Sequence, residues 1–358
     1  MARETGNGDA GVKAPVPGKI IIVMMSAVGD AVHVLPVVNA LKRANPACTI
    51  TWILQPGPAS LIADHPAVDE IIVFDRKKGF GGFLDLRRKL ASRRFDLLLN
   101  LQVYLKAGII TLLVEADRKL GFDRSRARDM NWIFTNLKIP RRPVQHVQDQ
   151  YFEFLEALGV SPTPLQWDLG PTENERGWQR DFVQSVGGEY AAIVVATSKA
   201  EKDWFPDRWA AVIDHLQDQY GIKSVLVGGT TEREVQARAA ILAAANYKPV
   251  DALGSGLRNL VSIVDGAGVV ISPDTGPLHI AVALNKPVIS LIGYTNPRRT
   301  GPYRKFRDLM IDAYADPGEN YPPSLENRPD RMQRISIDDV EHKIAIWNAK
   351  YRAKSVAK

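Results

Sequence analysis

The chain has 358 residues, of which 45% are hydrophobic and 24% are charged, and it carries a formal net charge of +6 at pH 7. This composition excludes an intrinsically disordered protein, and the length suffices for two α/β domains. Cys48 is the only cysteine, which excludes a disulfide framework and a cysteine-based metal site and predicts a cytoplasmic location. No apolar run reaches membrane-spanning length, and the polar residues 1–18 predict a flexible extension rather than a signal peptide.

The first half of the sequence repeats a pattern of strand, turn and helix. The apolar run Ile20–Met25 predicts a strand, the small residues 26–30 a turn, and the periodicity of 31–44 a helix. Further strands are predicted by the apolar runs at 49–54, 70–74 and 96–101. Because helical segments separate these strands, the pattern predicts a parallel sheet flanked by helices.

Basic residues are concentrated between Arg76 and Arg94, where eight of them accompany the single acid Asp85. Two interpretations stay open. The run is either a solvated helix flank, or a surface for anionic lipid headgroups or a phosphorylated acceptor, helped by the interleaved Phe80, Phe83 and Leu84. No nucleic-acid-binding module is recognisable, so a nucleic-acid partner is not expected.

The segment 161–171 contains three prolines, breaks the periodicity and predicts a linker between domains. After it the pattern restarts, with helices predicted at 172–186 and 207–219 and strands at 190–196 and 224–227. The predicted fold class is therefore α/β, with two doubly wound domains, 19–165 and 172–330, that face each other across a cleft. A final helix, 336–354, follows a proline-rich passage that can carry the chain back to the first domain.

The stretch Val270–Pro302 carries the strongest signal for a binding site. An apolar strand at 269–272 is followed by the turn Asp274–Gly276, and Pro277 can open a helix. The first turn of a helix presents free N–H groups and a positive dipole end, so it binds anions such as a diphosphate. A second strand at 287–292 repeats the open α/β pattern, in which ligands bind at the carboxyl ends of strands.

Four segments together resemble the bacterial lipopolysaccharide heptosyltransferases of glycosyltransferase family 9: Met25–Pro36, Thr197–Trp204, Gly228–Glu234 and Pro273–His279. The resemblance extends from about Lys19 to about Ile346. It implies a GT-B fold with two Rossmann-like domains, and inverting transfer of a heptose from ADP-heptose to the inner-core Kdo region of a lipid A precursor. It also implies weak, peripheral contact with the cytoplasmic face of the inner membrane and no cofactor. The stretch 102–128 is most similar to the enzyme that adds the first heptose.

On the acceptor side, the resemblance assigns Asp30 as the general base that takes the proton of the attacking hydroxyl. The alternative is a plain helix cap, since aspartate is a preferred capping residue. Gly29 is expected to let the acceptor approach the backbone, and Ser26 to donate a hydrogen bond, although both also suit a simple turn.

Two further residues are assigned to the acceptor. Gln102 closes a predicted strand at its carboxyl end and is expected to line the acceptor groove. Arg128 matches a basic position of the family, where an acidic sugar needs a bidentate cation. Arg124 and Arg126 can substitute for it, and a simple surface cluster is the alternative.

On the donor side, Lys202 matches the basic residue that contacts the donor phosphates and stabilises the departing ADP. Lys199 is a nearby competitor, and the spacing to Asp203 and Trp204 favours Lys202. Thr197 and Ser198 match the paired hydroxyl positions of the family.

The segment Pro273–His279 is the second part of the expected donor site. The backbone N–H groups of Thr275 and Gly276 are expected to bind the diphosphate, and Pro277 and Leu278 follow in the first helical turn. Asp274 is expected to accept a hydrogen bond from a sugar hydroxyl of the donor.

Two donor assignments leave alternatives. His279 either reaches a phosphate or packs beneath the turn. Glu232 is assigned to the ribose or base of the nucleotide, with Glu234 as the alternative.

The sequence lacks several motifs that are typical of other nucleotide-binding proteins, and their absence disfavours those classes of function. The only Gly-x-Gly-x-x-Gly match, Gly6–Gly11, precedes every predicted strand, so the dinucleotide oxidoreductases are not favoured. The sequence contains neither a phosphate-loop motif nor an Asp-x-Asp pair, so we predict metal-independent transfer. The alternatives are a family 9 transferase with another donor or acceptor, a GT-B sugar-nucleotide epimerase, and a non-catalytic nucleotide-sugar-binding protein.

Overall fold

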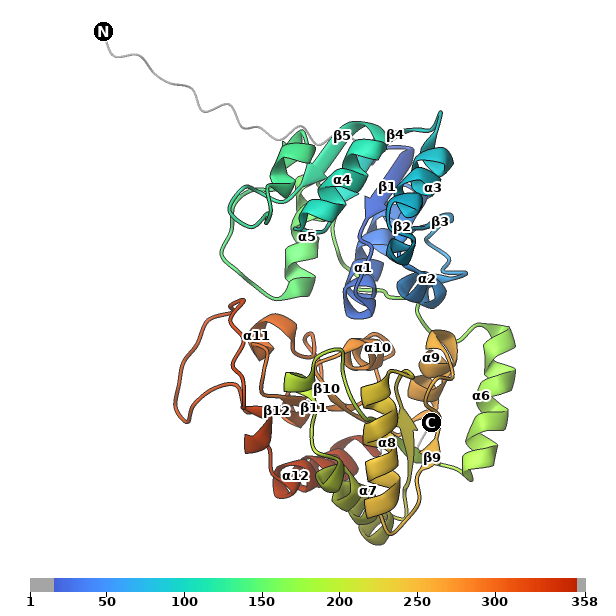
Figure 1. Cartoon of the computed structure of the whole chain (residues 1–358), viewed down its shortest axis with the longest axis vertical. Coiled ribbons are helices and arrows are strands. Elements are labelled where there is room, and N and C mark those ends of the chain that lie inside the picture. The colour runs from blue at the N-terminus through green and yellow to red at the C-terminus, as the bar shows by residue number, and fades with distance from the viewer. Residues whose placement is uncertain (1–15, 353–358) are drawn as a thin grey trace.

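The computed structural model describes residues 16–352, so most of the predicted extension 1–18 lies outside the described residues. The elements form two halves, each built around a six-stranded sheet (Figure 1). The strand orders are β3-β2-β1-β4-β5-β6 and β12-β11-β10-β7-β8-β9, and neighbouring strands run parallel. The predicted α/β class with two doubly wound sheets is therefore confirmed.

The first sheet has the strands β1 (Lys19–Val23), β2 (Thr49–Leu54), β3 (Glu70–Val73), β4 (Arg94–Asn100), β5 (Glu115–Gly121) and β6 (Leu137–Lys138). The helices of this first half are α1 (Val28–Ala44), α2 (Pro56–Ile62), α3 (Phe80–Leu90), α4 (Leu105–Leu113) and α5 (Val147–Ala157). The strand β5 was not predicted, because its sequence is rich in charged residues and only its last two residues are buried.

The second sheet has the strands β7 (Tyr190–Val194), β8 (Lys223–Val227), β9 (Val250–Asp251), β10 (Val269–Pro273), β11 (Val288–Ile292) and β12 (Met310–Asp312). The helices of this second half are α6 (Glu173–Val186), α7 (Pro206–Tyr220), α8 (Glu232–Ala244), α9 (Leu257–Gly266), α10 (Gly276–Ala283), α11 (Pro297–Thr300) and α12 (Ile337–Trp347). The central strands β7, β10 and β11 are buried over their whole length, as expected for parallel strands that helices cover on both faces.

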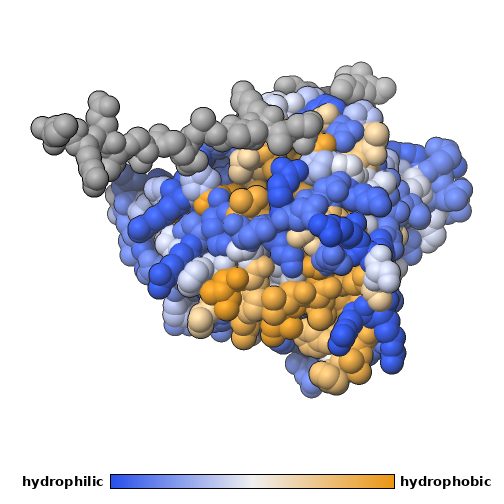
Figure 2. All heavy atoms as spheres, turned by 90° about the horizontal axis from the view of Figure 1, so that it is seen from above, coloured by the Kyte–Doolittle hydropathy of each residue, from blue (hydrophilic) through white to orange (hydrophobic). Residues whose placement is uncertain are grey.

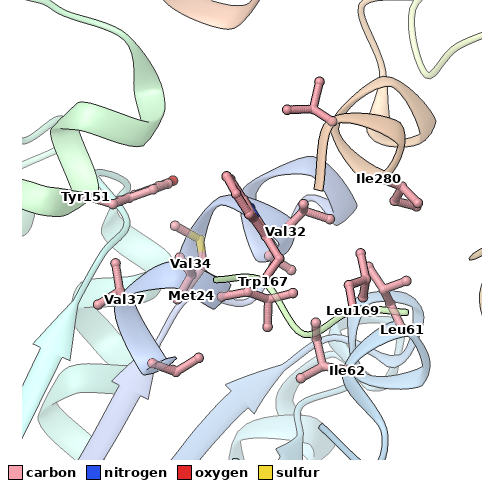
Figure 3. Close-up of a cluster of buried hydrophobic side chains, with 14 of the residues drawn as sticks. Met24, Val32, Val34, Val37, Leu61, Ile62, Tyr151, Trp167, Leu169 and Ile280 are labelled. Carbon is pink, nitrogen blue, oxygen red and sulfur yellow. The ribbon is translucent and has the colours of Figure 1, made fainter. Parts of the chain in front are cut away.

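One hydrophobic cluster continues from the first half into the second. Helix α1 packs against α10, and α2 packs against α9. The segment between α5 and α6 joins this cluster, because the buried Trp167 lies near Val32 of α1 and the buried Leu169 lies near Leu61 and Ile62 of α2 (Figure 3). Arg258 of α9 donates hydrogen bonds to the carbonyl oxygens of Leu61 and Leu169, both at 3.2 Å. The two halves therefore share packed contacts as well as a chain connection.

The last helix, α12, packs against α7, β11 and β12 of the second half. Its Trp347 is fully buried and donates a hydrogen bond to the carbonyl oxygen of Gly268 at 3.1 Å. The suggested return of this helix to the first half was therefore wrong, because its apolar face is buried on the second sheet. Within residues 16–352, the structure has no helix long and apolar enough to cross a membrane.

Candidate active site

The turns after β1 and β10 meet where the N-termini of α1 and α10 come together. A Cβ atom added to Gly29 would lie 2.7 Å from Cδ2 of His279, and one added to Gly276 would lie 2.9 Å from Cγ1 of Val28. The free side of Gly29 is thus filled by the second half of the protein. This corrects the expectation that Gly29 makes room for the acceptor. Both turns follow the carboxyl ends of parallel strands, where open α/β sheets bind their ligands.

A cavity of about 270 Å³ opens on the side of this contact that belongs mainly to the first half. Among its lining residues are the predicted site residues Ser26, Asp30, Gln102 and Arg128. The structure therefore brings all the assigned acceptor residues except Gly29 to one pocket, which we call the acceptor pocket.

Asp30 is held in the acceptor pocket by two hydrogen bonds. Its Oδ2 accepts from the backbone N–H of Ala27 at 2.9 Å, so the side chain caps the first turn of α1. Its Oδ1 accepts from the hydroxyl of Tyr151, on α5, at 3.2 Å. Burial, together with the negative charge of Asp30, raises the pKa of Tyr151 well above its ordinary value, so this hydroxyl stays protonated and donates. Both proposed roles of Asp30, as a cap and as an oriented carboxylate, are compatible with this geometry.

Gln102 and Ser26 have different surroundings in the pocket. The Gln102 side chain holds the turn after β1, since its Oε1 accepts from Met25 N at 3.0 Å and its Nε2 donates to Ser26 O at 2.8 Å. The Ser26 hydroxyl makes no hydrogen bond within residues 16–352. Gln102 thus shapes the pocket wall through the backbone of the turn.

The three candidate arginines are now distinguished. Arg126 is buried in ion pairs with Asp123 at 2.5 Å and Glu153 at 2.8 Å. The guanidinium of Arg124 lies 4.9 Å from the ring centroid of Trp132, and of these three arginines Arg126 and Arg128 line the pocket. Arg128 is exposed and forms no ion pair within the described residues, so its guanidinium remains available to a ligand.

Among the lining residues that were not predicted from the sequence are Tyr151 and Arg299. Arg299 belongs to α11 of the second half and reaches the acceptor pocket from across the contact. Its Nε atom is buried without a hydrogen-bond partner among the described residues. No sequence signal points to either residue, because their proximity to Asp30 arises only from tertiary packing.

A second cavity, of about 380 Å³, lies on the opposite side of the contact. We call it the donor pocket. It is lined by the predicted residues Thr197, Ser198, Thr275, Gly276 and Pro277, together with Val28 of α1 and the segment 228–231. Helix α10 begins at Gly276, one residue before the predicted start, and its first turn faces this cavity.

Asp274 is the centre of a buried polar cluster beside the donor pocket. Its Oδ2 accepts from Lys202 Nζ at 2.8 Å, from the hydroxyl of Thr295 at 2.5 Å and from that of Thr300 at 3.2 Å, while His279 Nε2 lies 3.6 Å from Oδ1. Burial alone would raise the pKa of Asp274, but the contacts with His279 and Lys202 lower it well below its ordinary value. The carboxylate is therefore charged and already accepts several hydrogen bonds within the protein. A sugar hydroxyl of the donor would have to compete with these donors for the expected hydrogen bond to Asp274.

The two candidate lysines differ in position. Lys202 Nζ also donates to the carbonyl oxygen of Asp274 at 3.1 Å, which fixes the ammonium group behind the turn and leaves one N–H. Lys199 is exposed, and its Nζ lies 5.5 Å from the ring centroid of Tyr294. Neither lysine lines the donor pocket, and of the two only Lys202 contacts the turn, at Asp274.

Thr197 and Ser198, the two residues at the paired hydroxyl positions, also differ in exposure. The hydroxyl of Thr197 is buried in its own turn, where it donates to the carbonyl oxygen of Lys199 at 2.7 Å, whereas Ser198 is exposed at the pocket.

Glu232 and Glu234, the two candidates for the carboxylate that contacts the nucleotide, lie in different places. Glu234 lines the donor pocket and accepts hydrogen bonds from the backbone N–H groups of Gly229 at 2.6 Å and Thr231 at 2.9 Å. Glu232 lies exposed on the surface of α8, where it accepts from Gln236 at 3.1 Å. The structure thus places the alternative, Glu234, at the pocket.

The remaining two residues of the α10 turn point inward. Leu278 is fully buried in the hydrophobic cluster, so only its backbone is near the donor pocket. His279 is buried beneath the turn, with its ring centroid 4.4 Å from that of His33, and its Nδ1 has no hydrogen-bond partner in the described structure. His279 was expected either to reach a phosphate or to pack beneath the turn, and in the structure it packs beneath the turn.

Similarity to a known protein family shows what kind of protein has these two pockets. The sequence model of Glycosyltransferase family 9 (heptosyltransferase) matches residues 83–317. The chain belongs to glycosyltransferase family 9. The lipopolysaccharide core heptosyltransferase OpsX of Haemophilus influenzae is 32% identical over 301 residues, which cover 84% of this chain and 86% of OpsX. Lipopolysaccharide heptosyltransferase 1 of Escherichia coli K12 is 28% identical, over 80% of this chain and 91% of that protein.

Solved structures support the fold of this family 9 glycosyltransferase. The E. coli heptosyltransferase WaaC with ADP superimposes with a TM-score of 0.71 at 23% identity, covering 94% of this chain and 99% of WaaC. The two parallel sheets are therefore the two halves of a GT-B fold, as the sequence resemblance implied. Among residues 16–352 of the glycosyltransferase, no group of three histidine, cysteine or acidic side chains is placed to hold a metal ion.

Proposed function

We propose that this family 9 glycosyltransferase transfers a heptose from ADP-heptose to the inner-core Kdo region of a lipid A precursor, with inversion at the anomeric carbon. One observation carries the proposal. An oriented carboxylate, Asp30, lies in one pocket, while a free helix N-terminus backed by Lys202 lies at the other, on either side of the contact between α1 and α10. The names of the similar proteins support heptose as the sugar and the lipopolysaccharide core as the acceptor.

The proposed chemistry needs a base and a stabilised leaving group. An oxygen of Asp30 accepts the proton of the acceptor hydroxyl as that hydroxyl oxygen forms a bond to the anomeric carbon. The bond between this carbon and the diphosphate oxygen breaks on the opposite face, and ADP leaves with both bonding electrons. The proton on Asp30 then passes to solvent.

The donor pocket is suited to the departing ADP. The backbone N–H groups at Thr275 and Gly276 and the positive end of the α10 dipole attract a diphosphate. The ammonium of Lys202, which is paired with Asp274 behind that turn, keeps one N–H that can donate to a phosphate oxygen. Such fixed donors stabilise negative charge as it develops, without reorganisation during the reaction. The nucleoside is then assigned to the part of the pocket formed by 228–231 and Glu234.

The acceptor pocket supports an acidic acceptor sugar. Arg128 and Arg299 line it from the two halves, and neither guanidinium forms an ion pair within the part of the chain that the structure describes. Planar guanidinium groups bind carboxylates in a bidentate manner, which suits the carboxylate of an inner-core sugar. We further propose that the enzyme works at the cytoplasmic face of the inner membrane, where its lipid-linked acceptor is located.

The decisive experiment measures ADP release from ADP-heptose, with and without a heptose-free lipopolysaccharide acceptor, in the presence and absence of chelator. We expect acceptor-dependent release that chelator leaves unchanged. Release without acceptor would indicate an epimerase or hydrolase, and tight ADP binding without release would indicate another donor sugar or a non-catalytic protein. Loss of turnover in chelator, restored by a divalent ion, would overturn the metal-independent mechanism.

A further inference from the structure

The first half of the protein exposes several large apolar side chains on neighbouring elements. Phe80 is 77% exposed, Leu112 is 61% exposed and Met130 is 62% exposed. The further exposed apolar residues of this region are Leu84, Tyr104, Leu105, Ile133 and Leu137. Figure 2, a view onto this end of the molecule, shows hydrophobic residues gathered in a band with hydrophilic residues on both sides. Contiguous apolar surface of this kind marks an interaction site.

These residues belong to one continuous surface. Helix α4 packs against α3 on one side and against the 3-10 helix η2 (Asn131–Phe134) on the other. Gly108 of α4 leaves no room for a Cβ atom because the ring of Phe134 lies directly against it. Leu105 and Leu112 are seven positions apart and so lie on one side of α4, and Ile133 is exposed on the neighbouring η2. We call the exposed surface of α3, α4 and η2 the apolar face.

Positive charge surrounds the apolar face. Along α3, the exposed residues Phe80, Leu84 and Arg87 recur at helical spacing and so lie on one side of the helix. Arg76, Lys77 and Lys106 are also exposed. Within residues 16–352, none of Arg76, Lys77, Arg87 and Lys106 takes part in an ion pair, whereas Arg93 and Arg94 of the same basic run are paired with Glu70 and Asp117. Arg87 and Lys106 lie on the same helices as exposed apolar side chains, and Arg76 and Lys77 lie on η1, just before α3.

We propose that η1 (Arg76–Lys78), α3, α4 and η2 form a docking surface for an anionic phospholipid bilayer. Apolar side chains that enter the interface and basic side chains that attract anionic headgroups are the two components of reversible membrane binding. A second copy of the chain is a poorer occupant. A two-fold contact through this surface would bring the same unpaired cations of both copies together.

The docking surface is continuous with the mouth of the acceptor pocket. Tyr104, which lines that pocket, directly precedes α4, and Arg128, which also lines it, lies three positions before the first residue of η2. Binding of α4 and η2 to the bilayer places the pocket opening at the level of the headgroups. A sugar attached to a lipid would then reach Asp30 without leaving the membrane. This last step rests on the proposed function, whereas membrane binding itself does not.

The test is cosedimentation of the full chain with vesicles, either of phosphatidylcholine alone or of equal parts phosphatidylcholine and phosphatidylglycerol. We expect binding to the anionic vesicles only, weakened by salt. The substitutions Leu112→Glu and Arg87→Glu should each weaken that binding by about tenfold or more, since each changes a charge at the headgroup level. Matched controls are Val235→Glu and Arg180→Glu, exposed helical positions of the second half, which should bind like the parent chain.

Two further measurements keep this test independent of the proposed function. Leu112→Glu should release ADP from a delipidated, water-soluble acceptor at the parent rate, because the substitution lies outside both pockets. The proposal is overturned by absence of binding to anionic vesicles, or by equal binding of the face variants and the controls. It is also overturned if the chain is a dimer in sedimentation equilibrium that Leu112→Glu dissociates, because the second copy would then occupy the surface.

Discussion

Gly29 and His279 touch across the two halves of the protein, with so little space that a methyl group on Gly29 would lie 2.7 Å from Cδ2 of the imidazole. The substitution Gly29→Ala must therefore push α1 and α10 apart or displace His279. Because the acceptor and donor pockets lie on either side of this contact, we expect kcat/KM to fall by at least tenfold. Overpacking should also lower the free energy of unfolding by about 1–3 kcal/mol.

Gly57→Ala is the matched control for this substitution, since Gly57 is also helical and a Cβ atom there meets nothing within 4 Å. Steady-state kinetics and urea unfolding of the two variants check the prediction. Equal effects at both positions would show that the contact between the halves does not require a glycine.

Asp30→Asn tests the general base. The amide oxygen can still accept from the N–H of Ala27, so the first turn of α1 keeps its cap, but the side chain no longer accepts a proton. We expect turnover to fall by about 10²–10⁴-fold, with ADP affinity near that of the parent enzyme. Calorimetric titration with ADP separates the two properties, and a parallel loss of both would instead assign Asp30 a structural role.

Tyr151→Phe refines the same test. It removes the 3.2 Å hydrogen bond to Asp30 but leaves the carboxylate in place. We expect a smaller loss of kcat than in Asp30→Asn, because the carboxylate remains but loses the hydrogen bond that orients it. Steady-state kinetics check this, and an unchanged kcat would show that Tyr151 serves packing only.

The positions of these residues explain what the sequence could reveal. Asp30, Lys202 and Thr275 could be assigned from the sequence because each lies in a segment that follows an apolar strand and that resembles a motif of the family. Tyr151 was missed because it is 121 residues away from Asp30 and lies in an ordinary amphipathic helix. The strand β5 was missed for a related reason, since partners on both sides, β4 and β6, stabilise it despite its charges. Contacts between distant segments have no local signal.

Lys202→Met should destabilise the protein as well as weaken donor binding. Asp274 is buried, and its pairing with Lys202 at 2.8 Å supplies the nearest full positive charge. Removing one partner of a buried ion pair costs about 3–5 kcal/mol. We expect a loss of unfolding free energy in that range and weaker ADP binding, measured by urea unfolding and calorimetry. Lys199→Met, at an exposed position, is the control and should change neither by much.

Because His146 is buried, we expect the folded protein to lose stability in mild acid. Burial lowers its pKa from 6.5 to about 4, although the hydrogen bond to the carbonyl oxygen of Gly301 opposes this shift. Between these two pH values the unfolded chain binds a proton that the folded chain rejects, so stability is fully present above pH 6.5 and falls as the pH decreases toward 4. The contribution at the acid end is on the order of 3 kcal/mol.

His146→Gln is the variant that isolates this contribution. Its amide can keep a hydrogen bond to Gly301 but does not titrate. Urea unfolding at about pH 7.5 and about pH 5 should show a smaller loss of stability on acidification in the variant than in the parent chain. If both chains lose the same free energy, other groups cause the acid sensitivity.

Arg299→Gln tests whether the second half contributes to the acceptor. The Arg299 guanidinium lines the acceptor pocket together with Asp30, and its Nε has no hydrogen-bond partner among the described residues. If it pairs with an anionic acceptor group, its removal should raise the KM for the acceptor by about tenfold, because a charge-assisted hydrogen bond contributes about 1.5–3 kcal/mol. The affinity for ADP should stay unchanged, since the residue does not line the donor pocket. Arg298→Gln, at the exposed neighbouring position, is the control. An equal rise in KM for both variants would indicate a general effect of surface charge rather than a contact of Arg299 with the acceptor.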